Sequence, residues 1–197
     1  MVGTAGNVSV RGGDHLAVTP TGAALASLQP EQVTVVDLDG NVVHGGLQPT
    51  SELELHLGVV RRHGAAAVVH THAPMCTALA CVLDELPCVH YQMLSFGGAV
   101  RVAPYATFGT PELADNVLAA LEGRSAALMG NHGAVTHAGD AHAAVEHMLL
   151  LEWACGVYWR ASQLGTPRIL DRGQQDAVID AALRRGYGTT HAITEER

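Results

Sequence analysis

One apolar segment in the first half of the chain ends in two histidines. From Ala65 to His72 it reads AAAVVHTH. Its β-branched residues favour a strand, and because strand side chains alternate between faces, His70 and His72 are expected on one face with Thr71 on the other. Two imidazoles on one rigid face can bind a divalent ion, and three histidines with a carboxylate or a water form a zinc-type set. In a chain with 12 histidines the pair also fits ordinary core or surface residues, so its partners must be sought elsewhere.

Length and composition favour one soluble domain. The chain has 197 residues, 48% of them hydrophobic, without a linker, a repeat or an apolar run long enough for a membrane helix. No signal or transit peptide is evident, and the cysteines lack paired metal spacing, which fits reduced thiols in the cytoplasm. The net charge is −8 with no basic cluster, which argues against nucleic acid and anionic membranes as partners.

The chain contains no lysine, and this removes two kinds of chemistry. A Schiff base with a carbonyl substrate and a P-loop phosphate site both need a lysine. Chemistry on a carbonyl would therefore use another electrophile, such as a metal ion. The absence of lysine favours the metal interpretation of His70 and His72.

Alternating strand and helix patterns predict one α/β sandwich. Strands are expected over residues 7–11, 15–19, 33–37, 41–44, 65–72, 87–91, 100–103, 126–129 and 134–137, and helices over 52–63, 74–83, 111–121, 141–163 and 176–185. Glu52 is expected in the first turn of its helix, with Thr50 or Ser51 as the N-cap and Gly64 as the stop.

Three segments near the front are rich in Gly, Asn, Ser and Thr: residues 3–7, 19–22 and 49–52. They fit ordinary turns, or an anion pocket of backbone N–H groups, hydroxyls and a helix N-terminus that holds phosphate without lysine. Glu52 likewise fits a helix dipole contact or a metal ligand, and His132 fits a turn cap or a ligand. Seven further histidines fit surface or satisfied core positions and carry no predicted role: His56, His63, His90, His137, His142, His147 and His191.

Several motifs occur in an order that resembles the class II aldolase and adducin family. They are GTAGNVSVR at 3–11, TPTG at 19–22, PTSE at 49–52, VVHTHA at 68–73, HY at 90–91, GG at 97–98, APYATFGT at 103–110 and HG at 132–133. The resemblance covers nearly the whole chain. It implies a single domain over 1–197, folded as an α/β/α sandwich around a mixed, mainly antiparallel sheet. The helix that usually precedes the first motif is expected to be missing, since that motif begins at Gly3.

The resemblance also implies a site. One zinc ion per subunit would be held by His70, His72 and His132, with Glu52 as a fourth ligand that substrate displaces and that then acts as the catalytic acid and base. Phosphate would lie among residues Asn7, Thr21, Gly22, Thr50 and Ser51. Tyr91, as proton donor to the aldehyde oxygen, and the nearby Phe108 would act across a subunit boundary in a homotetramer. Tyr187 resembles a C-terminal catalytic tyrosine.

The implied activity is reversible cleavage of a ketose 1-phosphate into dihydroxyacetone phosphate and an aldehyde. Within the family the chain is most similar to enzymes that cleave L-fuculose 1-phosphate, which yields L-lactaldehyde. Other (deoxy)pentulose 1-phosphates, a methylthioribulose-1-phosphate dehydratase and an L-ribulose-5-phosphate 4-epimerase remain alternatives, although Asp is typical of the epimerases at position 52. An adducin-like interaction module would be expected to lack the full metal set.

Overall fold

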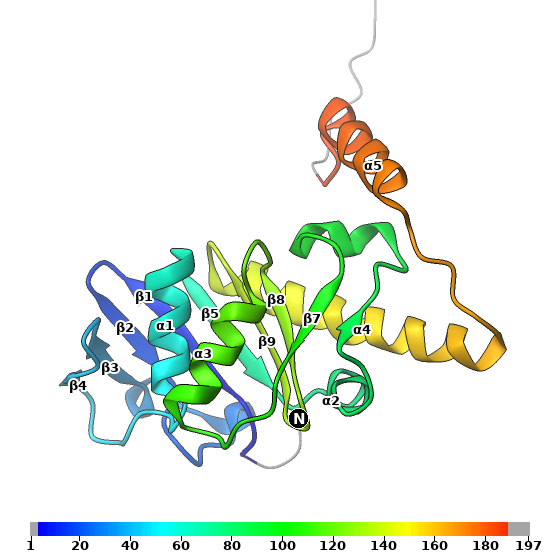
Figure 1. Cartoon of the computed structure of the whole chain (residues 1–197). Helices are drawn as coiled ribbons and strands as arrows, with labels where there is room; N and C mark the ends of the chain where they lie inside the picture. The colour runs from blue at the N-terminus through cyan, green and yellow to red at the C-terminus, as the bar shows by residue number, and fades with distance from the viewer. Residues whose placement is uncertain (1–3, 189–197) are drawn as a thin grey trace, which may run out of the picture.

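The chain is built around one sheet of nine strands. In a computed structural model that describes residues 4–188, the strand order is β4-β3-β2-β1-β5-β9-β8-β7-β6 (Figure 1). The strands are β1 (Asn7–Gly12), β2 (His15–Val18), β3 (Thr34–Asp37), β4 (Val42–His44), β5 (Ala67–Thr71), β6 (Glu85–Leu86), β7 (Val100–Ala103), β8 (Ala126–Met129) and β9 (Gly133–Ala138). Only β7 and β8 pair in parallel among these strands. The sheet is therefore mixed and mainly antiparallel, as predicted.

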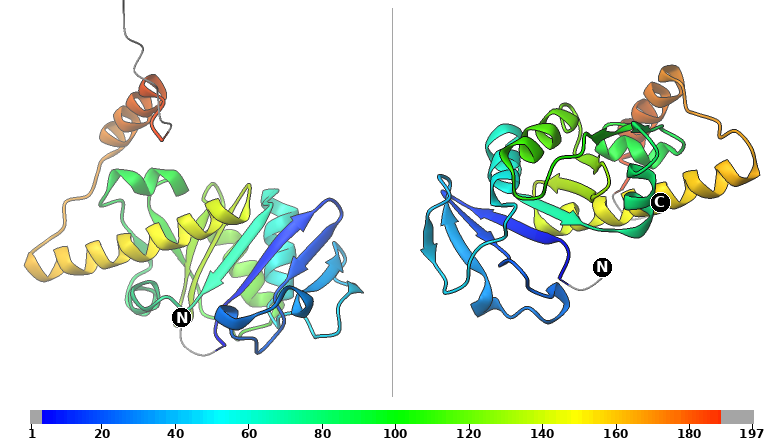
Figure 2. Two further views of the ribbon diagram at one scale, coloured as in Figure 1. Left: turned by 180° about the vertical axis from the view of Figure 1, so that it is seen from behind. Right: turned by 60° about the horizontal axis from the view of Figure 1, so that its bottom comes forward.

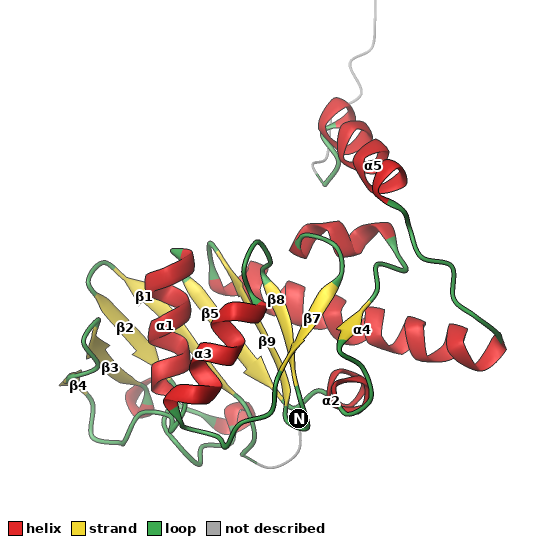
Figure 3. Ribbon diagram, viewed as in Figure 1, coloured by secondary structure: helices red, strands yellow, loops and turns green. Residues whose placement is uncertain are grey.

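Helices cover both faces of this sheet. Two of them, α1 (Leu53–His63) and α3 (Pro111–Ala120), pack on one face, and α2 (Pro74–Ala80) and α4 (Ala141–Leu164) pack on the other. The view from behind in Figure 2 shows α4 crossing the second face. The last helix, α5 (Arg172–Arg185), stands away from the sheet at the end of an extended segment (Figure 3). These layers confirm the predicted α/β/α sandwich.

Short 3-10 helices complete the described part of the chain: η1 (Leu25–Ser27), η2 (Pro30–Gln32) and η3 (Tyr91–Phe96). None of the helices within residues 4–188 is both long and apolar enough to cross a membrane. The ends of the predicted single domain over 1–197, including Gly3 at the start of the first motif, lie outside the described residues.

Several elements differ from the prediction: the helix expected over 74–83 ends at Ala80, and β6 is an additional strand. The strand expected over 87–91 is wrong, because η3 begins at Tyr91, where the His90 side chain accepts from Gln92 N, and Pro87 has no N–H for a strand ladder. Helix α5 begins at Arg172 rather than at 176, because Asp171 and Gln174 form a capping box. Glu52 is itself the N-cap residue of α1 rather than part of its first turn, so the expected N-cap at Thr50 or Ser51 is wrong; the Thr50 hydroxyl accepts instead from the backbone N–H of Glu52.

Strand pairing brings distant segments to the end of β5. Asn7 at the start of β1 lies opposite His70, and His70 lies opposite Val135 of β9 on the other side. The turn between β8 and β9 carries His132, and it closes through Asn131, which has a φ of 52°. Segments that are far apart in the sequence therefore meet at one end of the sheet.

Close backbone packing at this end predicts a large effect of Gly133→Ala. A Cβ at Gly133 would lie 2.3 Å from the carbonyl oxygen of Thr71, and a backbone atom of a central strand cannot move aside easily. We expect the free energy of unfolding to fall by about 2–3 kcal/mol, measured by urea denaturation. Gly139→Ala, just beyond the other end of β9, is the matched control because a Cβ there meets no atom within 4 Å. Equal unfolding midpoints for the two variants would contradict the prediction.

Candidate metal site

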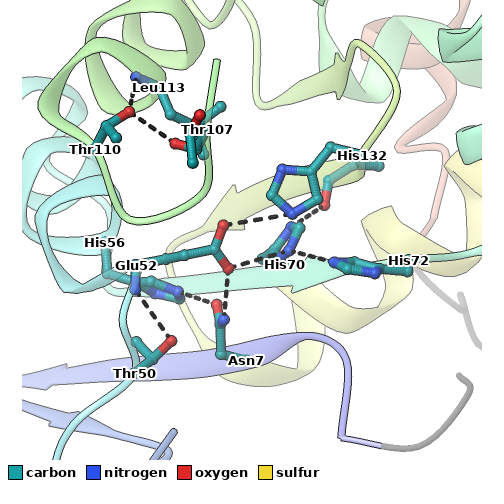
Figure 4. A network of polar contacts seen from close by, with 11 residues as sticks. Asn7, Thr50, Glu52, His56, His70, His72, Thr107, Thr110, Leu113 and His132 are labelled. Carbon is teal, nitrogen blue, oxygen red and sulfur yellow. Dashed lines mark hydrogen bonds and ion pairs between the residues drawn. The ribbon is translucent and has the colours of Figure 1, made fainter. Parts of the chain in front are cut away.

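Three histidine side chains converge at the end of β5. His70 belongs to β5, His72 follows that strand, and His132 comes from the β8–β9 turn. One ring nitrogen from each lies within 4.8 Å of the other two, and the Nε2 atoms of His70 and His72 are 3.2 Å apart. Thr71 faces the opposite way, with its hydroxyl 3.1 Å from the sulfur of Met148 in α4. The alternation expected of this segment is thus present, and Figure 4 shows the side chains of His70 and His72 next to each other.

The ring of His70 is oriented by the backbone of the neighbouring strand. Its Nδ1 lies 3.0 Å from the carbonyl oxygen of Ala134, an acceptor, so Nδ1 carries the proton and the lone pair of Nε2 faces the other two histidines. Burial lowers the pKa of His70 to about 4, although Glu52 opposes this shift. The ring is therefore neutral near pH 7, which is the form that binds metal ions.

Glu52 completes the group from the N-terminus of α1. Its Oε2 lies 3.3 Å from Nε2 of His70 and accepts a hydrogen bond of 2.8 Å from Nδ2 of Asn7, while its Oε1 lies 3.5 Å from Nε2 of His132. Burial alone would raise the pKa of Glu52, but His70, the hydrogen bond from Asn7 and His132 bring the pKa below its usual value. Glu52 is therefore a carboxylate at neutral pH.

The donors in this group fit a divalent metal ion. Oε1 of Glu52 is buried and has no hydrogen-bond partner among the described residues, and leaving a charged oxygen in that state is costly. One cation would accept the lone pairs of the imidazole nitrogens that face one another. The same cation would balance the charge of the unpartnered carboxylate oxygen. Three nitrogen ligands and one oxygen ligand form a set that suits zinc and similar ions.

A cavity of about 300 Å³ opens beside this group. Glu52, His72 and His132 lie on its wall. The cavity is also lined by every residue predicted to bind phosphate or substrate: Asn7, Thr21, Gly22, Thr50, Ser51 and Phe108. The structure therefore brings the two predicted halves of the site together, and Phe108 reaches the cavity of its own chain.

Further residues line the cavity that the sequence analysis did not single out. They are Thr4, Ala5, Gly6, Pro20, Tyr105, Ala106 and Asn131. Most belong to the motifs at 3–11, 19–22 and 103–110, so their place within those motifs was the available signal. Asn131 had no such signal.

Tyr91 and Tyr187 are not brought to this cavity within one chain. Their hydroxyl groups lie 3.1 Å apart, where η3 meets the end of α5. In Figure 1 both elements lie above the sheet, whereas β5 ends at its lower side. Their predicted roles depend on a neighbouring subunit and stay predictions.

Comparison with known proteins identifies the family of this chain. Residues 1–159 match the family model described as the class II aldolase and adducin N-terminal domain. The chain belongs to the class II aldolase and adducin family. The resemblance found in its motifs is thereby confirmed.

Relatives in the class II aldolase family carry more than one substrate name. The chain is 40% identical over 180 residues to the 5-methylthioribulose-1-phosphate/5-deoxyribulose-1-phosphate aldolase of Rhodospirillum rubrum, which covers 90% of this chain and 81% of that protein. It is 35% identical to the 5-deoxy-D-ribulose 1-phosphate aldolase of Bacillus thuringiensis, over 94% of this chain and 88% of that protein. The L-fuculose phosphate aldolase of Escherichia coli is 42% identical, over 68% of this chain and 62% of its own length.

Solved structures of class II aldolases share the fold. An L-fuculose 1-phosphate aldolase superposes with a TM-score of 0.88 at 35% identity, covering 92% of this chain and 87% of its own. The L-fuculose-1-phosphate aldolase of Thermus thermophilus gives a TM-score of 0.73 at 31% identity, covering 85% of this chain and 89% of its own.

Proposed function

We propose that this chain is a zinc-dependent aldolase that reversibly cleaves a 5-deoxypentulose 1-phosphate. The products would be dihydroxyacetone phosphate and a short aldehyde. The observation that carries the proposal is the buried oxygen Oε1 of Glu52, which has no hydrogen-bond partner among the described residues. It lies 3.5 Å from Nε2 of His132, one of the three clustered histidines, beside the cavity. The choice of substrate is supported by two relatives named for 5-deoxyribulose 1-phosphates, which match at least nine-tenths of this chain.

L-Fuculose 1-phosphate is the second candidate substrate. It is supported by the structural neighbour with a TM-score of 0.88 that bears this name. Both substrates would present the same first three carbons and the same phosphate to the protein. They differ only beyond C4, so the fragment released as aldehyde distinguishes them.

The phosphate would lie against Asn7, Thr21, Thr50 and Ser51. Thr50 and Ser51 precede α1, and the dipole of this helix favours an anion at its N-terminus. Hydroxyl groups, the amide of Asn7 and the helix dipole would therefore hold the phosphate, where other phosphate sites use a lysine. This anchoring would hold the ketose carbonyl near the histidines.

A zinc ion would be held by His70, His72, His132 and Glu52. When bound, it would supply a Lewis acid that polarises the ketose carbonyl. His70 comes from β5, and His132 comes from the β8–β9 turn, whose strand β9 pairs with β5, so the protein would offer a preformed ligand set. Glu52 would have a second role, because its carboxylate becomes free to exchange a proton once substrate displaces it.

In cleavage, the C4 hydroxyl loses its proton, the C3–C4 bond breaks, and its electron pair passes to the C2 carbonyl. Glu52 would deliver a proton to C3, and in synthesis it would remove the same proton. Tyr91 of a neighbouring copy would take the proton from the C4 oxygen, with Tyr187 beside it. A homotetramer with sites at subunit boundaries would satisfy these roles, and a fully active monomer would contradict them.

An exposed apolar stripe on α4 supports such an assembly. Val145, Leu149 and Trp153 follow one another at intervals of four residues and are 41%, 59% and 45% exposed. Side chains at this spacing lie on one face of a helix, and exposed apolar faces of this kind mark contacts with other chains.

One assay tests the activity and the substrate together. The zinc-loaded protein is incubated with dihydroxyacetone phosphate and acetaldehyde, methylthioacetaldehyde or L-lactaldehyde, and the products and their stereochemistry are identified. We expect kcat/KM for the first two aldehydes to exceed that for L-lactaldehyde by about tenfold or more. The reverse order would favour L-fuculose 1-phosphate, and no condensation with any aldehyde would reject the aldolase proposal.

A further inference from the structure

A chain of four buried polar side chains leads from the sheet to Glu52. The hydroxyl of Ser9 lies 2.7 Å from Nδ1 of His56, and Nε2 of His56 lies 2.5 Å from Oδ1 of Asn7. Asn7 in turn donates from Nδ2 to Oε2 of Glu52 at 2.8 Å. Figure 4 shows the part from His56 to Glu52. Ser9 and His56 are 1% and 0% exposed, and neither lines the cavity.

Only one orientation of the Asn7 amide gives every contact a donor and an acceptor. The opposite orientation would place the carbonyl oxygen of Asn7 against the carboxylate of Glu52, and two acceptors repel at that distance. With its oxygen toward His56, Asn7 requires a proton on Nε2 of that ring. Burial lowers the pKa of His56 to about 3, so the ring is neutral and its Nδ1 accepts from the hydroxyl of Ser9.

This orientation makes the two oxygens of Glu52 unequal. Oε2 is held by Asn7, whereas Oε1 lies near His132 without a hydrogen bond. A carboxylate that is anchored through one oxygen presents the other in a fixed position.

We propose that Ser9 and His56 are positioning residues for the aldolase reaction. They fix the amide of Asn7 so that its NH₂ group holds Oε2 of Glu52 and leaves Oε1 to serve the metal ion and the C3 proton. This role rests on the proposed function, because it acts through Glu52. The alternative is that His56 is only a structural core residue, whose hydrogen bonds stabilise the fold without affecting Glu52.

Two substitutions of His56 separate these interpretations. His56→Leu keeps the approximate size of the side chain but removes the N–H donor, and His56→Gln keeps a donor that can reach Asn7. We expect His56→Leu to lower kcat by about 10–100-fold with little change in KM, and His56→Gln to restore kcat to within about threefold of wild type. A purely structural role predicts the opposite order, since leucine suits a buried position better than glutamine.

Ser9→Ala and His63→Leu complete the set. Ser9→Ala leaves the donor of His56 in place but removes the group that selects its tautomer, so we expect a smaller loss of kcat than for His56→Leu. His63 lies two turns further along α1, and its Nε2 is buried without a hydrogen-bond partner among the described residues. His63→Leu is therefore the matched control, with unchanged kcat. Thermal unfolding checks that each variant is folded.

A second measurement does not depend on activity. Nitrogen-15 NMR of histidine-labelled, metal-stripped wild-type protein reports the tautomer of each ring. We expect His56 as the neutral Nε2–H tautomer, with a proton protected from exchange. An Nδ1–H tautomer could not donate to Asn7 and would overturn the proposal.

The outcomes separate the positioning role of Ser9 and His56 from the proposed function on which it rests. A wild-type protein that is inactive with every aldehyde rejects the proposed function, and the positioning role with it. An active wild type with an equally active His56→Leu variant rejects the positioning role alone. Lower kcat in His56→Leu, recovery in His56→Gln and the Nε2–H tautomer together support it.

Discussion

Replacing Glu52 with glutamine should lower aldolase turnover by about 10³-fold while the metal ion remains bound. Glutamine has the size of glutamate and keeps one oxygen that can face the histidines, but it cannot take up or deliver the C3 proton. Water cannot easily take over the role of Glu52 as acid and base in the variant, because this position is nearly closed to solvent. The loss should therefore fall on kcat.

The partial reaction isolates this role. With dihydroxyacetone phosphate alone in D₂O, the wild-type protein should exchange the C3 proton, and Glu52→Gln should not, as followed by proton NMR. Metal content is measured in parallel by mass spectrometry. Glu54→Gln is the matched control, because Glu54 lies two residues further along and is exposed. Full turnover by Glu52→Gln with zinc still bound would show that another residue is the base.

Replacing His132 with alanine should remove the metal ion and, with it, the activity. One nitrogen ligand of three is lost, and the remaining set no longer matches what zinc requires. We expect less than about a tenth of an equivalent of zinc after dialysis and a fall in kcat/KM of at least about 10³-fold. His132 is the best choice because it lies in a turn, whereas His70 is completely buried and its removal would also leave a cavity.

Chelation provides the complementary test on unaltered protein. Wild-type protein treated with a chelator should lose activity and recover it when zinc is added back, as measured by the condensation assay. His142→Ala, at an exposed position near the start of α4, should retain both zinc and activity. A wild-type protein without bound metal or chelator-sensitive activity would instead fit an adducin-like interaction module.

Local patterns predicted the elements that hold the site better than they predicted how those elements meet. The run from Ala67 to Thr71 is a strand because its β-branched residues fit a buried position, and Gly64 ends α1 in the left-handed conformation. The partnership of His70 with His132 depends instead on the pairing of β5 with β9, a contact between distant segments that no local period encodes. The motif resemblance supplied it.

Specific side-chain contacts explain what the local patterns leave out. The hydrogen bonds of His56 to Ser9 and Asn7 depend on how α1 packs against β1, and a single histidine in a helical segment does not reveal them. The apolar residues of 87–91 favour a strand, but the side-chain hydrogen bond at His90 starts a 3-10 turn there. In both cases the deciding contact is made by one side chain and leaves no periodic signal in the sequence.

The pairing of Asn7 with His70 has a consequence for what the protein can distinguish in a sugar phosphate. These residues lie on adjacent strands joined by backbone hydrogen bonds, so the spacing between the proposed phosphate pocket and the histidines is as rigid as the sheet itself. Tyr105 and Phe108, which are 62% and 67% exposed, line the same cavity from a loop. We expect the protein to accept only one length for the three-carbon phosphate fragment, because the sheet fixes the distance between the two ends of the site that bind it. The loop can change in evolution without disturbing the sheet, which leaves the identity of the aldehyde free to diverge among relatives.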